Sequence, residues 1–334
     1  MNAGVLRGPS VFPFDPSVKM AGHAYIRGDS RTLLPKSPKM RFFPIVGYLL
    51  GTLSLRAVAW NSIETYIDAL LEFGEDFIDP APIVEQGKVS TLADNVIGRV
   101  DVTTNFVGLE LNIEYIYGLF LEGSKANTTQ LIPTPVGFTP QALVIEQPIV
   151  FASFIVNFSF PTVDLTLPLQ IDAVVRFDDT NMTITSYDVT FRRWSQFWDY
   201  FIPLLVPKVT EELIAANTTG VDYGNSTDII VHRAAADICT EAQTYCLGEN
   251  QQYESYEQCV QFLTKEVPFG ASWSGGENTG FCRYIHKNMV KYRPEVHCPH
   301  VGPTGGDYCI PRNYTDVVLN PPFNESLIAY AASE

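Results

Sequence analysis

The alternating stretch at residues 163–177 constrains the fold of this chain more than any other part of its sequence. Apolar side chains occupy every second position, namely Val163, Leu165, Leu167, Leu169, Ile171, Ala173, Val175 and Phe177. A period of two is typical of a β-strand that turns one face to a core or cavity and the other to water. Pro168 cannot donate to a neighbouring strand, so it predicts an edge, a bulge or a bend. The chain should therefore contain a long strand in a sheet that is buried on one side.

Residues 40–59 have the composition of a secretory signal peptide. A positively charged start and the apolar run 42–55 are followed by small residues before Trp60. The run is shorter than the roughly 20 apolar residues of a membrane-spanning helix, which favours a cleaved signal over an anchor. We expect the mature chain to begin at Trp60. Residues 1–39 are then a gene-model extension, with Met40 as the true start.

Charge and glycosylation sequons agree with export. The chain has a formal net charge of −15, and without residues 1–59 it keeps 14 Lys or Arg and 35 Asp or Glu, a net charge of about −21. Such an acidic chain repels nucleic acid and anionic membranes, so neither is expected as a partner. Seven Asn-x-Ser/Thr sequons are expected to carry surface glycans, at Asn127, Asn157, Asn181, Asn217, Asn225, Asn313 and Asn324. Asn157 lies in an apolar stretch and is the least suited of them.

The first domain is expected to span residues 60–216, with helices before the sheet. Asn61 and Glu64 form a capping box ahead of helically spaced apolar residues that extend to Ile78. A shorter helix is expected over 84–95 and a first strand over 99–107, while 112–121 is compatible with either. Strands should follow over 142–145, 149–160, 163–177 and 182–192. A short helix that begins near Trp194 should close the domain.

This order of elements resembles the NTF2-like fold, which includes the SnoaL-like cyclases and ketosteroid isomerases. The stretch from Arg176 to Trp194, with Ile-Thr-Ser-Tyr-Asp-Val-Thr-Phe-Arg-Arg-Trp at its end, is similar to the end of that domain in secreted fungal members. The resemblance covers about residues 61–208. It implies an α+β cone, in which N-terminal helices pack on a curved antiparallel sheet around an apolar pocket, and sheet-to-sheet pairing as a homodimer. The scaffold hosts isomerases, cyclases, lyases, transport factors and non-catalytic modules, so it names no activity.

Catalysis in this domain would depend on carboxylates or tyrosines. No histidine or cysteine lies between Trp60 and Val231, so proton transfer there cannot use an imidazole or a thiol. The candidates nearest the central strands are Asp172, Tyr187 and Asp188. The resemblance implies the same residue types, since isomerases of this fold use an Asp base and a Tyr donor. Asp172 should face away from the apolar set, and a structural role for each candidate is the competing interpretation.

A linker over 217–230 separates this domain from a cysteine-rich segment, 231–334. Six cysteines within 71 residues are expected to form three disulfides, whose pairing the sequence does not reveal: Cys239, Cys246, Cys259, Cys282, Cys298 and Cys309. Cys239 and Cys246 lie two helical turns apart, too far to bond to each other. The segment should be mainly helical, with a helix over 280–292 and a turn-rich loop over 297–306. It resembles the tail of secreted fungal proteins that carry it after an NTF2-like domain.

Three of the four mature histidines, His286, His297 and His300, fall within fifteen residues and are candidate ligands of a divalent metal. Three imidazoles suit zinc or copper and leave a coordination position open. In the competing interpretation these rings hydrogen-bond within the stapled loop and cap the preceding helix, since no HExxH or CxxC spacing is present. No other cofactor is expected.

The sequence leaves three functions open. A secreted glycoprotein that binds a small hydrophobic molecule or a partner protein without catalysis accounts for the lack of a recognisable catalytic set. A cofactor-independent isomerase, cyclase or lyase would need an Asp and a Tyr to converge on the cone pocket. A metal-dependent enzyme would have its site at the three histidines.

Overall fold

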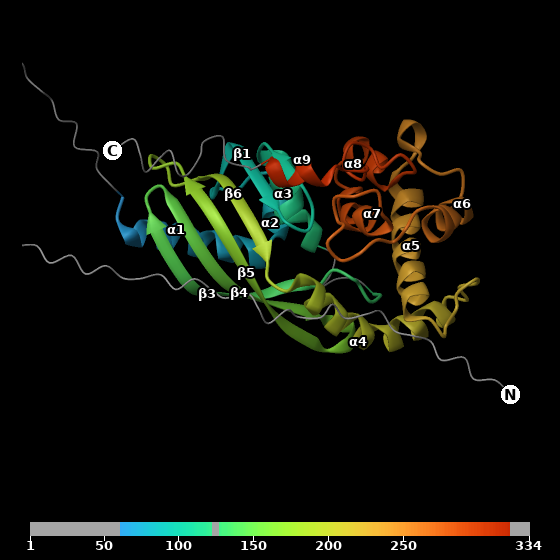
Figure 1. Ribbon diagram of the computed structural model, residues 1–334. Coiled ribbons are helices and arrows are strands. Elements are labelled where there is room, and N and C mark those ends of the chain that lie inside the picture. Colours follow the sequence, from blue (N-terminus) through green and yellow to red (C-terminus); the bar gives the residue numbers. More distant parts are fainter. Residues whose placement is uncertain (1–60, 122–126, 321–334) are drawn as a thin grey trace, which may run out of the picture. The chain divides into compact units, whose positions relative to one another are not determined.

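The computed structural model describes residues 61–121 and 127–320. The segments assigned to a signal peptide and to upstream sequence, and the sequon at Asn324, lie outside these residues. The described residues form a six-stranded sheet, helices that pack on one face of it, and a helical C-terminal segment (Figure 1). This is the predicted α+β, NTF2-like architecture, followed by the predicted disulfide-stapled segment.

The sheet has the strand order β2-β1-β6-β5-β4-β3. Its strands are β1 (Leu92–Val100), β2 (Asn105–Val107), β3 (Thr134–Glu146), β4 (Ile149–Phe160), β5 (Leu165–Phe177) and β6 (Ile184–Phe191). Neighbours are antiparallel except β1 and β6, which run parallel. The register shifts once between β1 and β6 and twice between β3 and β4. Such irregularities increase the local bend and twist of strands, and Figure 1 shows the resulting curvature.

Strand β5 has the predicted alternation of burial. Its buried residues are Leu169, Ile171, Ala173, Val175 and Phe177, and the residues between them are half-buried on the opposite face. Pro168 keeps a place in the register opposite Asn157 of β4. The strand begins at Leu165 because residues 161–163 form a 3-10 turn, so the predicted start was two residues early.

Three helices precede or interrupt the first strands: α1 (Ile63–Ile78), α2 (Ala81–Gln86) and α3 (Leu109–Ile116). Ser62, and not Asn61, caps α1, since its hydroxyl accepts a hydrogen bond from Thr65 N at 3.3 Å. The helix predicted over 84–95 was wrong beyond Gln86, because Gly87 adopts a left-handed conformation and ends α2. The strand predicted over 99–107 is a hairpin of β1 and β2, and the ambiguous stretch 112–121 begins as helix α3.

The helix that follows the sheet is long, contrary to the prediction of a short one. Helix α4 (Trp194–Ala215) has 22 residues and contains Pro203 and Pro207. A proline inside a helix costs about 3 kcal/mol because it removes a backbone hydrogen bond. The helix keeps a continuous buried stripe that offsets this cost, made of Phe197, Phe201, Leu205, Val209 and Leu213.

The C-terminal segment is held together by three disulfides: Cys239–Cys259, Cys246–Cys298 and Cys282–Cys309. Its helices are α5 (Ser226–Tyr245), α6 (Tyr256–Gln261), α7 (Gly280–His286), α8 (Pro294–Val301) and α9 (Tyr314–Leu319). The predicted helix over 280–292 already ends at His286 and continues as a 3-10 turn. The predicted turn-rich loop over 297–306 was wrong as far as Val301, because Pro294 begins α8, in the first turn where proline is tolerated, whereas residues 302–306 do form turns.

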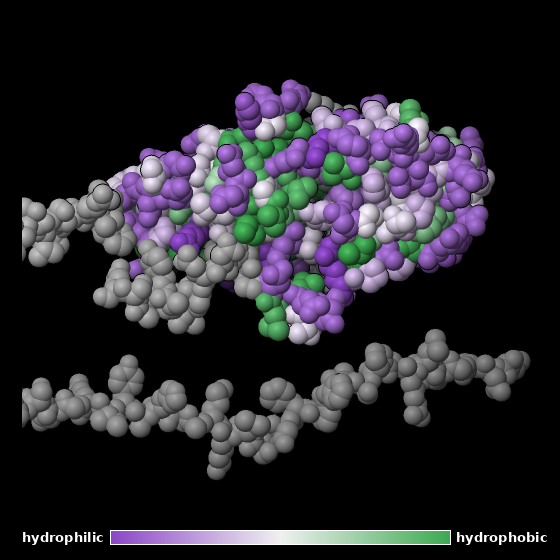
Figure 2. Space-filling view, turned by 90° about the horizontal axis from the view of Figure 1, so that it is seen from above, coloured by the Kyte–Doolittle hydropathy of each residue, from purple (hydrophilic) through white to green (hydrophobic). Residues whose placement is uncertain are grey.

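The described surface is mainly polar. Figure 2 shows one face on which hydrophilic residues predominate, with a smaller hydrophobic area near its middle. None of the helices in the described ranges is long and apolar enough to cross a membrane. Five sequon asparagines are exposed, namely Asn127, Asn181, Asn217, Asn225 and Asn313, whereas Asn157 is half-buried.

Candidate functional site

An apolar cavity of about 130 Å³ lies between the helices and the buried face of the sheet. Its walls come from α1, α3, α4, α7 and strands β1 and β3 to β6, and aromatic rings make up much of them. The hydroxyl groups among the lining residues belong to Thr103, Tyr115 and Tyr187. No carboxylate or imidazole of the described residues lines the cavity. It is therefore suited to an apolar molecule and poorly equipped for acid–base chemistry.

Helix α7 brings the C-terminal segment into the cavity wall. Phe281 and Ile285, four residues apart on one side of this helix, both line the cavity. The ring of Phe281 meets that of Trp198 edge-on, with centroids 4.9 Å apart. The segment thus forms part of the cavity wall, and the cavity is incomplete without it.

Tyr187 is the one of the three catalytic candidates that reaches the cavity. Its hydroxyl donates a hydrogen bond to Asn112 Oδ1 at 2.7 Å, and Asn112 Nδ2 donates to the Gly108 carbonyl at 2.8 Å. The tyrosine ring crosses Gly98 so closely that a Cβ there would stand 1.9 Å from Tyr187 Cζ. Burial raises the pKa of Tyr187 well above its ordinary value. The hydroxyl therefore stays protonated and acts as a fixed hydrogen-bond donor.

Asp172 and Asp188 lie on the other face of the sheet. Arg99 Nε donates to Asp188 Oδ1 at 2.9 Å, and Arg192 pairs with Asp172. This placement agrees with the alternation that turned Asp172 away from the apolar set. Neither carboxylate converges with Tyr187 on the cavity.

The three candidate histidines, by contrast, lie together. His286 ends α7, and His297 and His300 lie three residues apart on α8; all three are at most 5% exposed. Their ring centroids are separated by 4.7 Å (His286–His300), 5.2 Å (His297–His300) and 6.0 Å (His286–His297). One ring nitrogen of each lies within 4.8 Å of those of the other two. We call His286, His297 and His300 the histidine cluster.

Two carboxylates flank the histidine cluster. His297 Nε2 faces Glu114 Oε2 at 3.0 Å, and His300 Nε2 lies 2.7 Å from Asp307 Oδ1. Glu114 also accepts a hydrogen bond from Arg293 Nη1 at 2.7 Å. Burial alone would raise the pKa of Glu114, but the facing His297 and Arg293 outweigh it and hold this pKa below its usual value. Glu114 is therefore a carboxylate at neutral pH.

Burial favours the neutral form of two of the three imidazoles, His286 and His300. Burial, reinforced by the neighbouring imidazoles, lowers the pKa of His286 well below its ordinary value. Burial also lowers the pKa of His300, although its hydrogen bond to Asp307 acts in the opposite direction. Neutral rings keep one nitrogen lone pair free to accept a proton, a hydrogen bond or a metal.

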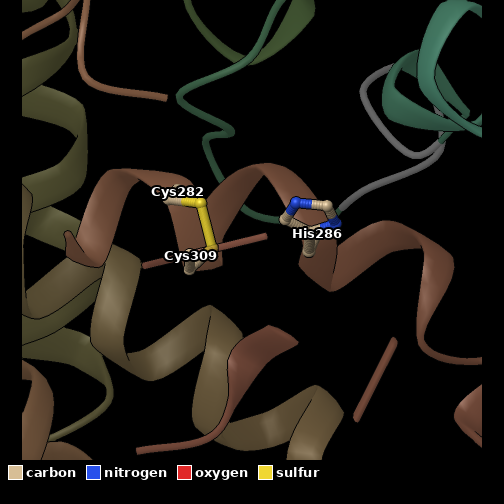
Figure 3. Close-up of side chains that lie close together, drawn as sticks. All are labelled: Cys282, His286 and Cys309. Atoms are coloured by element: carbon tan, nitrogen blue, oxygen red, sulfur yellow. A yellow bond between two sulfur atoms is a disulfide. The ribbon is translucent and has the colours of Figure 1, made fainter. Parts of the chain in front are cut away.

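A disulfide borders the histidine cluster. Figure 3 shows Cys282 one helical turn before His286 on α7, with its sulfur bonded to that of Cys309. A ring nitrogen of His286 lies within 4.8 Å of these sulfurs. Because the sulfurs are bonded to each other, they are not thiolate ligands.

Sequence reasoning did not single out Glu114 or Asp307. Glu114 stands in an otherwise mostly apolar stretch over 109–121, where a buried carboxylate needs a charged or hydrogen-bonding partner. Glu110 and Asn112 share this stretch, so the sequence did not show which of its polar residues is buried at a site. Asp307 lies in a turn and is mostly exposed, so no sequence pattern distinguished it.

Comparison with known proteins identifies the family. Residues 71–189 match the BfoA N-terminal domain, and residues 193–312 match the BfoA family C-terminal domain. Over 260 residues the chain is 37% identical to Bifonsecin B biosynthesis cluster protein A of Aspergillus brasiliensis, covering 77% of this chain and 83% of that protein. This chain belongs to the BfoA family. A second BfoA-family relative, Aurasperone B biosynthesis cluster protein A of Aspergillus niger, is 36% identical over 260 residues, covering 77% of this chain and 81% of that protein.

Solved structures resemble this BfoA-family chain more distantly. An NTF2-like protein of unknown function from Cytophaga hutchinsonii aligns with a TM-score of 0.28 and 12% identity, over 38% of this chain and 96% of that one. An LEH-like epoxide hydrolase from M. tuberculosis aligns with a TM-score of 0.30 and 12% identity, over 46% and 97%. Likeness at this level indicates no activity for the present chain.

Proposed function

We propose that this BfoA-family protein binds a small apolar molecule in its cavity and that the residues around the cavity do not transfer protons to it. The cavity itself carries this proposal, because its walls are apolar and aromatic. The Tyr187 hydroxyl is already bonded to Asn112, and Asp172 and Asp188 face away. The site therefore offers shape and apolar surface more than a reacting group.

An isomerase, cyclase or lyase is the alternative. Two relatives carry the names of biosynthesis cluster proteins, and such a cluster needs enzymes that act on small molecules. A reaction in this cavity would have to use Tyr115 or Tyr187. The Tyr115 hydroxyl donates to Thr103 Oγ1 at 2.7 Å, and burial raises the pKa of both phenols. Both are weak acids there, which favours binding over proton transfer.

Export and glycosylation form part of the same proposal. Disulfides persist in oxidising compartments, and the C-terminal segment has three of them. A signal peptide at residues 40–59, with glycans on the five exposed sequons, fits that setting. Sheet-to-sheet pairing as a homodimer stays a prediction, which sedimentation analysis would test.

A neutral fluorescent probe, N-phenyl-1-naphthylamine, tests the binding proposal. Ala173 lies on β5 in the cavity wall, whereas Val174, the next residue, faces the other side of the sheet. Probe fluorescence should rise on binding to the wild-type protein, and Ala173→Phe should weaken binding at least about tenfold by filling the cavity. Val174→Phe adds a ring to the opposite face and should leave binding unchanged. Absence of binding, or equal binding by all three proteins, would contradict the proposal.

A further inference from the structure

The histidine cluster takes no part in the proposed binding of an apolar molecule, yet it has the features of a ligand site. Three imidazoles from two helices converge in the interior, and each is at most 5% exposed. We propose that His286, His297 and His300 bind one divalent transition-metal ion through ring nitrogens, with Glu114 and Asp307 orienting two of the rings.

Buried ring nitrogens without hydrogen-bond partners are the main support for this metal site. Nδ1 of each of the three rings is buried and has no hydrogen-bond partner in the described part of the chain. A buried polar atom without a partner is costly, and three such atoms in one place require a common explanation. A metal ion would accept all three lone pairs at once.

Asp307 fixes which nitrogen of His300 is free. Because Asp307 accepts from His300 Nε2, the proton of this ring belongs on Nε2, and Nδ1 keeps its lone pair. Glu114 Oε2 lies 3.0 Å from Nε2 of His297, but this pair lacks hydrogen-bond geometry, so both nitrogens of His297 are without a hydrogen-bond partner among the described residues. A metal-bound histidine usually donates its other nitrogen to a carboxylate, which sets both tautomer and ring orientation. The cluster has this arrangement at His300, and at His297 it has a carboxylate close to Nε2.

The spacing suits a metal after a small movement. Metal–nitrogen distances of about 2.0–2.1 Å in a tetrahedral site place the nitrogens about 3.4 Å apart. One nitrogen of each ring, either Nδ1 or Nε2, lies within 4.8 Å of one nitrogen of each of the other two rings. The rings would have to approach one another by at most about 1.4 Å.

The ligand chemistry selects the class of metal. Imidazole nitrogens suit zinc, copper, cobalt and nickel, whereas magnesium and calcium prefer oxygen ligands. The nearby sulfurs of Cys282 and Cys309 are bonded to each other, so a site dominated by thiolates does not arise. Three imidazoles leave at least one coordination position for water or another molecule.

The location gives such a metal a structural consequence. His286 lies on α7, whose Phe281 and Ile285 line the cavity. Glu114 belongs to α3 of the first domain, and the other two histidines belong to α8. A metal bound here would hold α7 and α8 in place against α3. Because α7 contributes Phe281 and Ile285 to the cavity, the metal would also hold that part of the cavity wall in place.

Cobalt uptake by the full chain, freed of metal with a chelator, tests the proposal. The wild-type protein should bind one equivalent of Co²⁺ with visible d–d absorption that added Zn²⁺ abolishes. The double variant His297→Gln/His300→Gln should lose this absorption. Asp307→Asn should bind Co²⁺ about 10- to 100-fold more weakly, since it removes only an orienting acceptor. Asp307 is 83% exposed, so this variant reports on the site even where the double variant does not fold.

The matched control is His232→Gln. His232 is equally buried but lies on α5, with Nδ1 2.9 Å from the Asp228 carbonyl oxygen. This variant should bind Co²⁺ like the wild type. Failure of the wild-type protein to bind Co²⁺ or Zn²⁺ would overturn the proposal and assign the free nitrogens to ordered water. Undiminished binding by Asp307→Asn and the double variant would overturn it as well.

Discussion

His297 Nε2 lies 3.0 Å from Glu114 Oε2, and this contact joins α8 of the C-terminal segment to α3 of the first domain. The other oxygen of Glu114 accepts from Arg293 Nη1 at 2.7 Å. One buried carboxylate therefore serves two side chains that are distant from it in sequence. The disulfides stabilise the segment internally, whereas Glu114 helps to position it on the cone.

Glu114→Gln should lower the free energy of unfolding by about 1–3 kcal/mol, because the ion pair of this buried carboxylate with Arg293 is lost. Glu110→Gln is the control, since Glu110 also meets Arg293, at 2.8 Å, but is 68% exposed. Its effect should stay within about 0.5 kcal/mol. Urea unfolding with chelator present measures both. Equal losses in the two variants would contradict a special role for Glu114.

The contribution of His286 and His300 to the stability of the metal-free protein should decrease as the pH falls below about 6.5. The pKa values of His286 and His300 are lowered in the native state, so the unfolded chain binds protons that the folded chain does not. The free energy of unfolding should then fall by up to about 1.4 kcal/mol per pH unit for each histidine. The contribution is constant above pH 7, where both states are neutral. Asp101, whose pKa burial raises to about 6, acts in the opposite direction. The histidine contribution is therefore measured as the difference in slope between the wild type and His286→Gln/His300→Gln, in urea unfolding at pH 7.5, 6.5 and 5.5, and equal slopes would refute it.

Gly98→Ala should disturb the cavity through Tyr187. A Cβ at Gly98 would stand 1.9 Å from the Tyr187 ring, so the ring must move and its bond to Asn112 should break. We expect a loss of about 1–3 kcal/mol and weaker probe binding. The control is Gly118→Ala, whose Cβ would meet only the flexible Met289 side chain, at 3.3 Å. Urea unfolding measures both variants. If both have the same urea midpoint as the wild type, the close approach of Gly98 to the Tyr187 ring does not contribute to stability.

The parts that the sequence predicted well are those governed by local patterns. The alternation along β5 predicted a strand and its buried face, and cysteine spacing excluded a bond between Cys239 and Cys246. Local patterns did not predict elements whose extent depends on tertiary burial. Helix α4 is an example, because it continues through Pro203 and Pro207.

At the site, the sequence could not predict residues that only the folded chain brings together. Histidine spacing suggested a cluster, and the structure brings the three rings together. The oxygens that flank them come from Glu114, more than 170 residues before His286, and from a turn that contains Asp307. Only the folded chain brings such distant groups together, so no spacing rule could name them.

The disulfide Cys246–Cys298 should matter more than Cys239–Cys259, both for stability and for the histidine cluster. It closes a loop of 52 residues, compared with 20, so its loss should cost about 4 kcal/mol, compared with about 3 kcal/mol. Cys298 also lies between the two α8 histidines, whereas Cys239 and Cys259 join α5 to α6. Replacing the first pair by serine should therefore weaken Co²⁺ binding, and replacing the second should not. Urea unfolding and cobalt titration of both double variants test this, and equal cobalt affinities would show that the disulfide does not position the cluster.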